Sequence, residues 1–251
     1  MRDVAALALQ ELGGFSLLVA ETAREVVRRR PEWRVLMGQL YHHGVLSVAI
    51  ATVTALFTGM VLALQTSYSL AAYGAKFFVG DVVALSLVRE LGPVLTSLMV
   101  GGRVGAGITA EVGTMKVTEQ VDAIRAMAAS PVRKLVVPKV LAILLMLPLL
   151  VVLADFVGIM GGLIIAVTSL NQPAVFYMQH VIKALSPQDI MSGLGKTVVF
   201  ALLIAFIACY KGLNATGGAD GVGRATTETV VAASLTVLIS DFFLTKLFLA
   251  F

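Results

Sequence analysis

Five long runs of apolar residues, separated by short polar segments, set the pattern of this chain. The runs cover residues about 44–70, 81–108, 138–168, 188–210 and 227–250. Each is at least as long as the roughly 20 residues with which an α-helix crosses a bilayer, and none alternates apolar with polar residues as barrel strands do. Because a helix satisfies its own backbone hydrogen bonds in lipid, the pattern predicts an all-α integral membrane protein with five transmembrane helices in one domain, 1–251.

The N-terminal segment, residues 3–30, has a different pattern. Its apolar residues recur every three or four positions, as on one helix face: Val4, Ala8, Leu12, Phe15, Val19, Ala23 and Val26. Charged residues interrupt this segment too often for a span. We expect an amphipathic interfacial helix on the membrane surface, with its arginines toward anionic headgroups: Arg24, Arg28, Arg29 and Arg30. The alternative is an ordinary helix packed on the bundle.

The composition is that of a membrane protein, and the sequence argues against a signal peptide, an internal disulfide and a histidine metal site. Of 251 residues, 58% are hydrophobic and 14% charged, against roughly 45–50% and 25% in a soluble domain. The basic cluster follows the first apolar stripe, whereas a signal peptide places it before. The single Cys209 excludes an internal disulfide. The adjacent His42 and His43 cannot face each other on a helix, so they predict interfacial residues and no metal site.

The distribution of Lys and Arg predicts the orientation. Thirteen basic residues, Lys139 among them, lie in the N-terminal region and in the connections after the second and fourth spans, and three, Lys76, Lys183 and Lys246, lie on the other side. The positive-inside rule therefore makes the N-terminus cytoplasmic, and five spans put the C-terminus on the opposite side. The segment 171–187 is expected outside, where its amphipathic pattern predicts a short interfacial helix.

The second span carries charge at a depth where charge is costly. Arg89 lies about 10 Å into the span, and an uncompensated charge there costs about 2.5–3.5 kcal/mol. Neighbours on a helix point apart, so Arg89 and Glu90 cannot neutralise each other. Pro93 deprives the carbonyl of residue 89 of its helical partner, and Gly92 eases bending. We expect a kinked helix that opens a polar cavity; the alternative is a buried ion pair with Lys196, Asp155 or Asp241.

Glycine-containing motifs in the spans predict close packing rather than nucleotide binding. Gly101 and Gly105 form a GxxxG pair, as do Gly158 and Gly162. No strand precedes the first pair, which argues against a dinucleotide fingerprint. The sequence Gly195-Lys196-Thr197 resembles the end of a phosphate-binding loop, but Ile190 stands where that loop needs glycine.

The connection after the second span is predicted to contain a short cytoplasmic helix, residues 118–128. Thr118 can cap it and Ser130-Pro131 can stop it. Its apolar stripe comprises Val117, Val121, Ile124 and Ala128, and its charged face Glu119, Asp122 and Arg125. Such a helix can seat in a partner's groove; the alternative is a plain surface helix.

The connection at 211–227 contains five glycines and is expected to be a flexible or tightly turned loop. Thr226 or Thr227, followed by Glu228, is expected to cap the last span.

Three stretches of the sequence resemble the MlaE-type permease family, the membrane subunits of ABC lipid transporters. They are RELGPVLTSLMVGGRVGAGITAEVGTMKVTEQVDAI, SPVRKLVVPKV and GGADGVGRATTETVV. The resemblance implies a homodimeric, non-catalytic permease in the bacterial inner membrane. It also implies cytoplasmic ATPase subunits that bind the ATP, a periplasmic ring of MCE-domain subunits and often a STAS-domain protein. No cofactor is expected in this chain. Such systems move phospholipids between the two membranes and maintain outer-membrane lipid asymmetry.

The resemblance also implies roles for particular residues. The helix 118–128 corresponds to the coupling helix, so Glu119, Asp122 and Arg125 are expected to transmit motion from the ATPase. The lipid cavity is expected at the dimer centre, near Leu64, Tyr68, Tyr73, Arg89, Glu90 and Leu91.

Two other classes of function are compatible with the residues alone. An ion-coupled secondary transporter or channel would use Arg89, Glu90, Asp155, Lys196 and Asp241 as a relay. A membrane scaffold would only anchor its partners, and changes at Glu90 would leave lipid transport intact.

Overall fold

The computed structural model describes residues 2–28 and 32–250, and every element in these ranges is helical. Among these residues, five continuous helices are long and apolar enough to cross a membrane, which confirms the all-α fold with five predicted spans. We call them spans 1 to 5: Trp33–Ala71, Lys76–Val117, Val132–Thr168, Pro187–Leu213 and Gly218–Phe248. Arg29 and Arg30, assigned to the membrane surface above, lie outside the described residues.

The spans contain shorter elements where the helix changes its winding. Span 1 joins α2 (Trp33–Leu40), a π-helical turn η1 (Tyr41–Val45) and α3 (Leu46–Ala71). Span 2 joins a 3₁₀ turn η2 (Lys76–Phe78), α4 (Val79–Ser86), the π-helical turn η3 (Leu87–Leu91), α5 (Gly92–Val100), the π-helical turn η4 (Gly101–Gly105) and α6 (Ala106–Val117). Span 3 joins the π-helical turn η5 (Val132–Val136) and α8 (Val137–Thr168), span 4 is α10 (Pro187–Leu213), and span 5 belongs to α11 (Gly218–Ala250).

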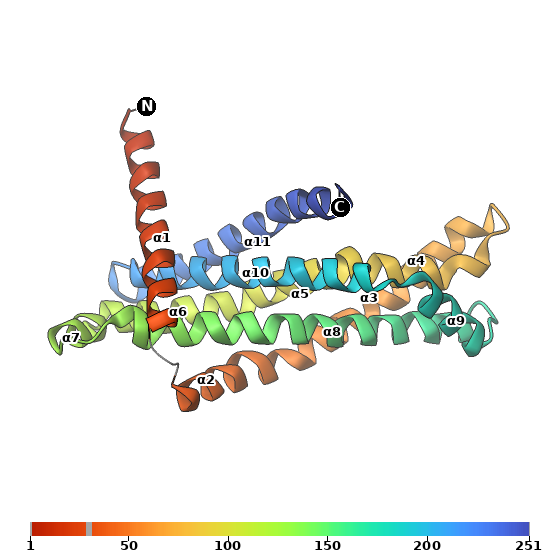
Figure 1. Cartoon of the computed structure of the whole chain (residues 1–251), viewed down its shortest axis with the longest axis horizontal. Helices are drawn as coiled ribbons and strands as arrows, with labels where there is room; N and C mark the ends of the chain where they lie inside the picture. The colour runs from red at the N-terminus through yellow and green to blue at the C-terminus, as the bar shows by residue number, and fades with distance from the viewer. Residues whose placement is uncertain (1, 29–31, 251) are drawn as a thin grey trace.

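The spans run roughly along the long axis of the molecule, with two short helices at opposite ends (Figure 1). The helix α7 (Gln120–Ala126) lies at one end, and α9 (Ala174–Ala184) lies at the other beside α4. We call these the α7 end and the α9 end. The α8 helix is central, because it contacts α2, α3, α5 and α10.

The N-terminal helix α1 (Arg2–Arg28) runs across the direction of the spans near the α7 end (Figure 1). It packs on α10, where the Phe15 ring lies edge to face with Phe206 and Tyr210, at centroid distances of 6.3 and 5.8 Å. Gly14 allows this approach, since a Cβ there would lie 2.9 Å from the Tyr210 hydroxyl. The helix is therefore docked on the bundle, and its place on a membrane surface stays a prediction.

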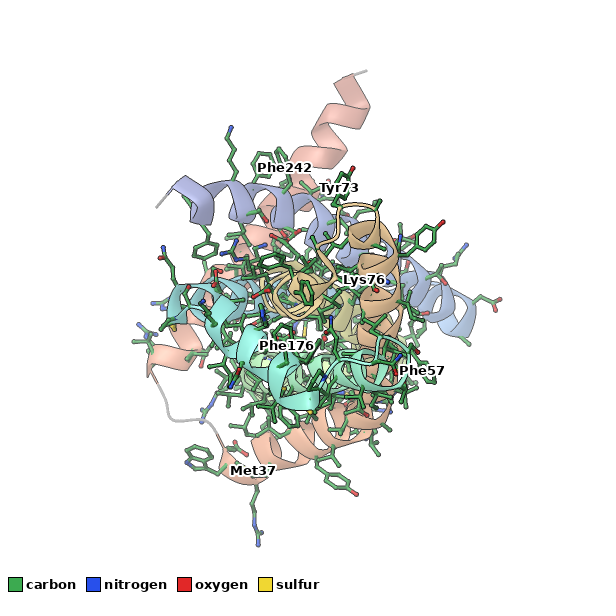
Figure 2. All side chains as sticks on the ribbon, turned by 90° about the vertical axis from the view of Figure 1, so that its right-hand side faces the viewer. Met37, Phe57, Tyr73, Lys76, Phe176 and Phe242 are labelled. Atoms are coloured by element: carbon green, nitrogen blue, oxygen red, sulfur yellow. The ribbon has the colours of Figure 1, made fainter. Side chains whose placement is uncertain are left out.

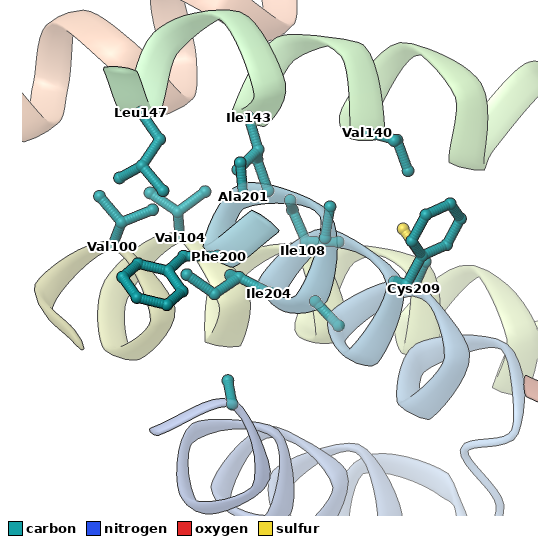
Figure 3. Packing of buried hydrophobic residues seen from close by; sticks show 14 of the residues in the cluster. Val100, Val104, Ile108, Val140, Ile143, Leu147, Phe200, Ala201, Ile204 and Cys209 are labelled. Carbon is teal, nitrogen blue, oxygen red and sulfur yellow. The ribbon is translucent and has the colours of Figure 1, made fainter. Parts of the chain in front are cut away.

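The core is built from residues that recur every three or four positions on spans 2, 3 and 4. Figure 3 shows Val100, Val104 and Ile108 of span 2 facing Ile143 and Leu147 of α8, and Phe200 and Ile204 of α10 between them. In lipid, where apolar contact is available everywhere, helix association depends on close packing of this kind.

Small residues bring two helix backbones into direct contact. A Cβ at Gly59 of α3 would overlap the carbonyl of Gly158 on α8, and one at Gly161 would overlap the carbonyl of Leu56. Gly158 therefore has the close helix contact that its GxxxG pattern predicts. Gly162 instead faces the Tyr177 hydroxyl of α9, whose side chain is fully buried.

The glycine-rich stretch 211–227 differs from the expected loop. Only residues 214–217 separate α10 from α11, so the tightly turned alternative is the right one. Gly217 has φ +89°, and a Cβ at Gly221 would overlap the carbonyl of Thr216. Thr226 and Thr227 lie inside α11 and donate to the carbonyl of Gly223, so the prediction that they cap the last span is wrong. Glycine here allows a tight turn and close contact, which composition alone does not distinguish from flexibility.

Candidate lipid and coupling sites

Span 2 changes its winding just before Pro93. The turn Leu87–Leu91 is π-helical, and α5 resumes at Gly92 with Pro93 in its first turn. The Arg89 carbonyl, which Pro93 cannot bond, accepts a hydrogen bond from Nζ of Lys196 on α10, at 3.2 Å. The polar group freed by proline is therefore satisfied by a cation from another span.

Lys196 is the centre of a polar cluster that we call the Lys196 hub. Its side chain is 2% exposed, and its ammonium lies 2.6 Å from Glu90 Oε2 and 2.7 Å from the Thr245 hydroxyl. Asp241 Oδ1 lies 3.1 Å away in an ion pair without hydrogen-bond geometry. Spans 2, 4 and 5 thus meet at one cation and two carboxylates. Glu90 therefore forms the ion pair with Lys196 that was the alternative to a polar cavity, although the Glu90 side chain is 40% exposed.

Arg89 points away from Glu90 and pairs with a different residue. Its Nε donates to Asp189 Oδ1 at 2.6 Å. Asp189 also closes a capping box with Ser186 at the start of α10, accepting from the Ser186 backbone N–H at 2.9 Å. None of the partners proposed from sequence is the one used. A serine followed three residues later by an acidic residue, before an apolar run, predicts the capping box. This pattern does not predict that Asp189 also pairs with Arg89.

Gly92 lies against a buried carboxyl group. A Cβ at Gly92 would overlap Oδ1 of Asp155 on α8, and this oxygen is buried without a hydrogen-bond partner among the described residues. Arg89 pairs with Asp189 and not with Asp155, so the proposed ion pair between Arg89 and Asp155 is wrong. Gly92 provides the space for this carboxyl group in addition to any ease of bending.

A narrow crevice opens beside the kink. Leu91 and Gly92 line it together with Thr54, Thr58 and Thr96. It encloses about 10 Å³, room for about one water molecule, whereas sites for drug-sized ligands enclose roughly 300–1,000 Å³. This crevice cannot enclose a phospholipid within one chain.

The other residues assigned to the lipid cavity lie on the surface of the chain. The residues Leu64, Tyr68 and Tyr73 are 46%, 87% and 84% exposed. They lie toward the α9 end, on the last turns of α3 and the turn that follows. The structure thus places Glu90 in the Lys196 hub, Arg89 in a separate pair with Asp189 and Leu91 in the crevice. The other three residues form an exposed surface.

Gly101 and Gly105 face spans 4 and 5. A Cβ at Gly101 would lie 3.6 Å from the Ala233 Cβ, and one at Gly105 would lie 3.6 Å from Ile204 and from Thr229. One turn further, the Thr109 hydroxyl lies 2.9 Å from the Thr229 hydroxyl. The glycines lie where span 2 packs on its neighbours.

The short helix at the α7 end is smaller than predicted. Thr118 does not cap it: its hydroxyl donates to the carbonyl of Thr114 at 2.8 Å, which extends the preceding helix. The break comes at Glu119, whose φ of 61° is left-handed, and α7 ends before Ala128, whose φ is 55°. Left-handed residues, rather than a side-chain cap and Pro131, bound the helix.

The charged residues of this helix are exposed. Asp122 accepts from Lys116 at 2.9 Å and from Arg125 at 3.2 Å. The hydrogen bond from Lys116 holds the pKa of Asp122 below its ordinary value. Val121 on the opposite face is fully buried, which fixes the helix so that Glu119, Asp122 and Arg125 are presented outward.

Comparison with known proteins decides the family. The chain matches the model of the MlaE permease over residues 36–247. The chain belongs to the MlaE permease family. It is 42% identical to a probable ABC transporter permease protein of Rickettsia bellii over 95% of this chain and 92% of that protein. It is 37% identical to the intermembrane phospholipid transport system permease protein MlaE of Haemophilus influenzae, over 93% of this chain and 89% of that protein.

A chloroplast protein is also similar to this MlaE-family chain. The TRIGALACTOSYLDIACYLGLYCEROL 1 protein of Arabidopsis thaliana is 34% identical over 92% of this chain and 66% of its own length.

A second polar cluster in this MlaE-family chain was missed by the sequence reasoning. Lys139, counted above among cytoplasmic loop residues, is 2% exposed inside α8 and contacts Glu111 and Gln39. Gln39 also accepts from His43, which is buried within the chain. A lysine at the end of an apolar run fits both interpretations, and its buried contacts with Glu111 and Gln39 separate them.

Proposed function

We propose that this chain is the non-catalytic permease subunit of an ABC transporter that moves phospholipids between the inner and outer membranes. ATP hydrolysis would take place on a partner subunit, and this chain would need no cofactor. The observation that supports the proposal best is the continuity of span 2. One helix carries Glu90 of the Lys196 hub, and α7 with its exposed charges follows at its end. The name of the Haemophilus relative, an intermembrane phospholipid transport permease, supports the substrate.

The lipid-binding surface is proposed to become a cavity when two copies of the chain assemble. A crevice of about 10 Å³ cannot enclose a lipid within one copy, whereas Leu64, Tyr68 and Tyr73 offer exposed apolar and aromatic surface. Leu91 would continue this surface toward the kink, and Arg89 and Glu90, both partly exposed, would supply polar contacts for the headgroup. A homodimer with its lipid site at the centre fits this arrangement.

The coupling step is proposed to act through α7. Glu119, Asp122 and Arg125 are exposed there, while Val121 anchors the helix. A cytoplasmic ATPase that receives this helix in a groove would move the end of span 2. This requires the α7 end to be cytoplasmic and the α9 end periplasmic, as the distribution of basic residues predicts.

The proposed assembly lies in the bacterial inner membrane. It combines two copies of this chain, cytoplasmic ATPase subunits, a periplasmic ring of MCE-domain subunits and a STAS-domain protein. With α1 on the cytoplasmic surface, the N-terminus would be cytoplasmic and the C-terminus periplasmic.

The test is purification with native partners, followed by reconstitution into vesicles. We expect an ATPase and phospholipid to copurify, and ATP to drive lipid movement. Arg89→Ala and Glu90→Ala are expected to impair transport while the ATPase stays bound, whereas Lys183→Ala, on the exposed face of α9, is not. A partner-free chain that transports in response to an ion gradient would identify a secondary transporter and contradict the proposal.

A further inference from the structure

A pocket at the α9 end lies apart from the Lys196 hub. It forms between the turn after α3 and the turn before α9, and encloses about 350 Å³. Its lining is mostly apolar and includes Ala71, Phe77, Leu170 and Phe176. The rings of Phe77 and Phe176 meet edge to face at 6.1 Å. Figure 2 looks along the spans onto this end and shows Lys76 and Phe176 there.

One cation lies at this apolar pocket. Lys76 lines it and is exposed, and it forms no ion pair with any residue that the structure describes. An apolar wall with a single ammonium group suits a ligand that is both apolar and anionic. A small soluble anion would leave the aromatic wall without a partner.

Gln172 fixes the position of the segment that carries Lys76. Its Nε2 donates to the Lys76 carbonyl at 2.8 Å, and its backbone N–H donates to the Ala166 carbonyl at 3.0 Å. Its Oε1 is buried without a donor among the described residues. A small opening of the pocket would let this oxygen accept a hydrogen bond from a hydroxyl group on a ligand.

An exposed apolar stripe leads away from the pocket along span 1. Phe57, Val61, Leu64 and Tyr68 are exposed and follow one another at intervals of four, three and four residues, and Ala71 continues the stripe into the pocket. These intervals keep the residues on one helix face. An acyl chain lying on the stripe would place its headgroup at the pocket, close to the end of the span where headgroups lie.

We propose that this pocket binds the phosphate-bearing headgroup of an anionic phospholipid, with Lys76 on the phosphate, the headgroup against Phe77 and Phe176, and an acyl chain along the span 1 stripe. Gln172 acts as a positioning residue for Lys76. The inference rests on the proposed function, because Leu64 and Tyr68 are shared with the proposed lipid surface. It adds a headgroup site at the rim, and with it a preference for lipid charge.

The experiment uses tryptophan fluorescence in the full chain. In a Trp33→Phe background, which removes the one natural tryptophan, Leu64→Trp places a reporter about 10 Å along the helix from Ala71. The chain is reconstituted in dioleoyl phosphatidylcholine containing increasing amounts of phosphatidylglycerol brominated on its acyl chains. We expect quenching to show a preference of about two- to fivefold for the anionic lipid, the range of one partly exposed ion pair. A matched reporter, Leu235→Trp on the exposed face of α11, is expected to show none.

Further variants separate a built site from general surface charge. Lys76→Gln and Gln172→Leu are expected to lower the preference at the Leu64→Trp reporter, whereas Lys76→Arg and Lys183→Gln keep it. An equal loss with Lys183→Gln, or equal preference at both reporters, would overturn the proposal. Abolition of the preference by millimolar inorganic phosphate would identify a soluble-anion site and also overturn it. The assay contains no ATPase, so its outcome is independent of whether the assembled complex transports lipid.

Discussion

The ammonium group of Lys196 on span 4 donates to the carbonyl of Arg89 on span 2, at 3.2 Å, and so supplies a hydrogen bond that Pro93, which has no N–H, cannot donate. The same ammonium compensates Glu90 and Asp241. The same lysine thus satisfies the carbonyl group that proline leaves without a donor and compensates two carboxylates. The kink in span 2 and the charge balance of the bundle therefore depend on one side chain.

Loss of the Lys196 charge is expected to destabilise the chain strongly. Lys196→Met keeps the apolar stem but leaves two carboxylates and one carbonyl without their donor. Removing one member of a buried pair costs about 3–5 kcal/mol, and the partial exposure of Glu90 places the expected loss at the lower end, about 3 kcal/mol. The measurement is the midpoint of denaturant unfolding in detergent. Glu90→Gln combined with Lys196→Met should recover part of the loss; an unchanged midpoint for Lys196→Met alone would show that the hub does not stabilise the fold.

Pro93 and Lys196 are expected to be energetically coupled. Pro93→Ala restores a backbone N–H that can bond the Arg89 carbonyl, so the carbonyl no longer depends on Lys196. In a double-mutant cycle, Lys196→Met should cost about 1 kcal/mol less in the Pro93→Ala background than in the natural chain. Unfolding of the four proteins measures this difference. Pro148→Ala, in the interior of α8, is the control and should give strictly additive effects.

Gly92→Ala is expected to destabilise the chain, because its methyl group would overlap Oδ1 of Asp155. Overpacking of this kind costs about 1–3 kcal/mol. The matched control is Gly102→Ala, ten residues along the same span, where a Cβ would meet nothing within 4 Å; there the change should be neutral or stabilising by up to about 1 kcal/mol. Asp155→Ala should rescue Gly92→Ala, and thermal unfolding of the single and double variants checks it. Equal effects at Gly92 and Gly102 would rule out the steric explanation.

Glu119 allows charge and backbone conformation to be separated. Its left-handed φ of 61° is unfavourable for glutamate, so Glu119→Gly should stabilise the chain by about 1 kcal/mol while removing the carboxylate. Ala128→Gly, at φ 55°, should stabilise similarly with no change of charge. If Glu119 transmits ATPase motion, lipid-stimulated ATPase activity of the complex falls in Glu119→Gly and Glu119→Lys but not in Ala128→Gly. Equal activity in all three variants would remove Glu119 from the coupling contact.

The fold class was predictable because apolar runs of 20 residues or more have few alternatives in a membrane. The bare carbonyl at Arg89 was predictable too, since it follows from the covalent structure of proline. Its partners were not. Whether Lys196, Asp155 or Asp189 meets Arg89 or Glu90 depends on how each span is rotated about its axis. That rotation is set by π-helical turns such as Leu87–Leu91, which leave no regular spacing in the sequence.

The same limit explains the errors at helix ends. Thr118, Thr226 and Thr227 have good capping chemistry, but each hydroxyl bonds a carbonyl three or four residues earlier, because packing against neighbouring helices extends the helix past the residue. Lys139 was ambiguous for a related reason: only its buried contact with Gln39 and Glu111 distinguishes a core lysine from a topology signal.

Two π-helical turns, Leu87–Leu91 and Gly101–Gly105, interrupt the α-helical winding of span 2. The α-helical segments on either side of each turn are rotated relative to one another about the helix axis. Each such turn holds about one residue more than an α-helical turn, and one residue corresponds to about 100° of rotation. Without the first turn, every side chain from Gly92 to the end of the span would face a different neighbour. Without the second turn, Ile108 and Val112 would no longer lie on the same face of the helix as Val100. The three α-helical segments of span 2 can therefore each turn a different face toward the neighbouring helices, while the backbone remains one continuous helix.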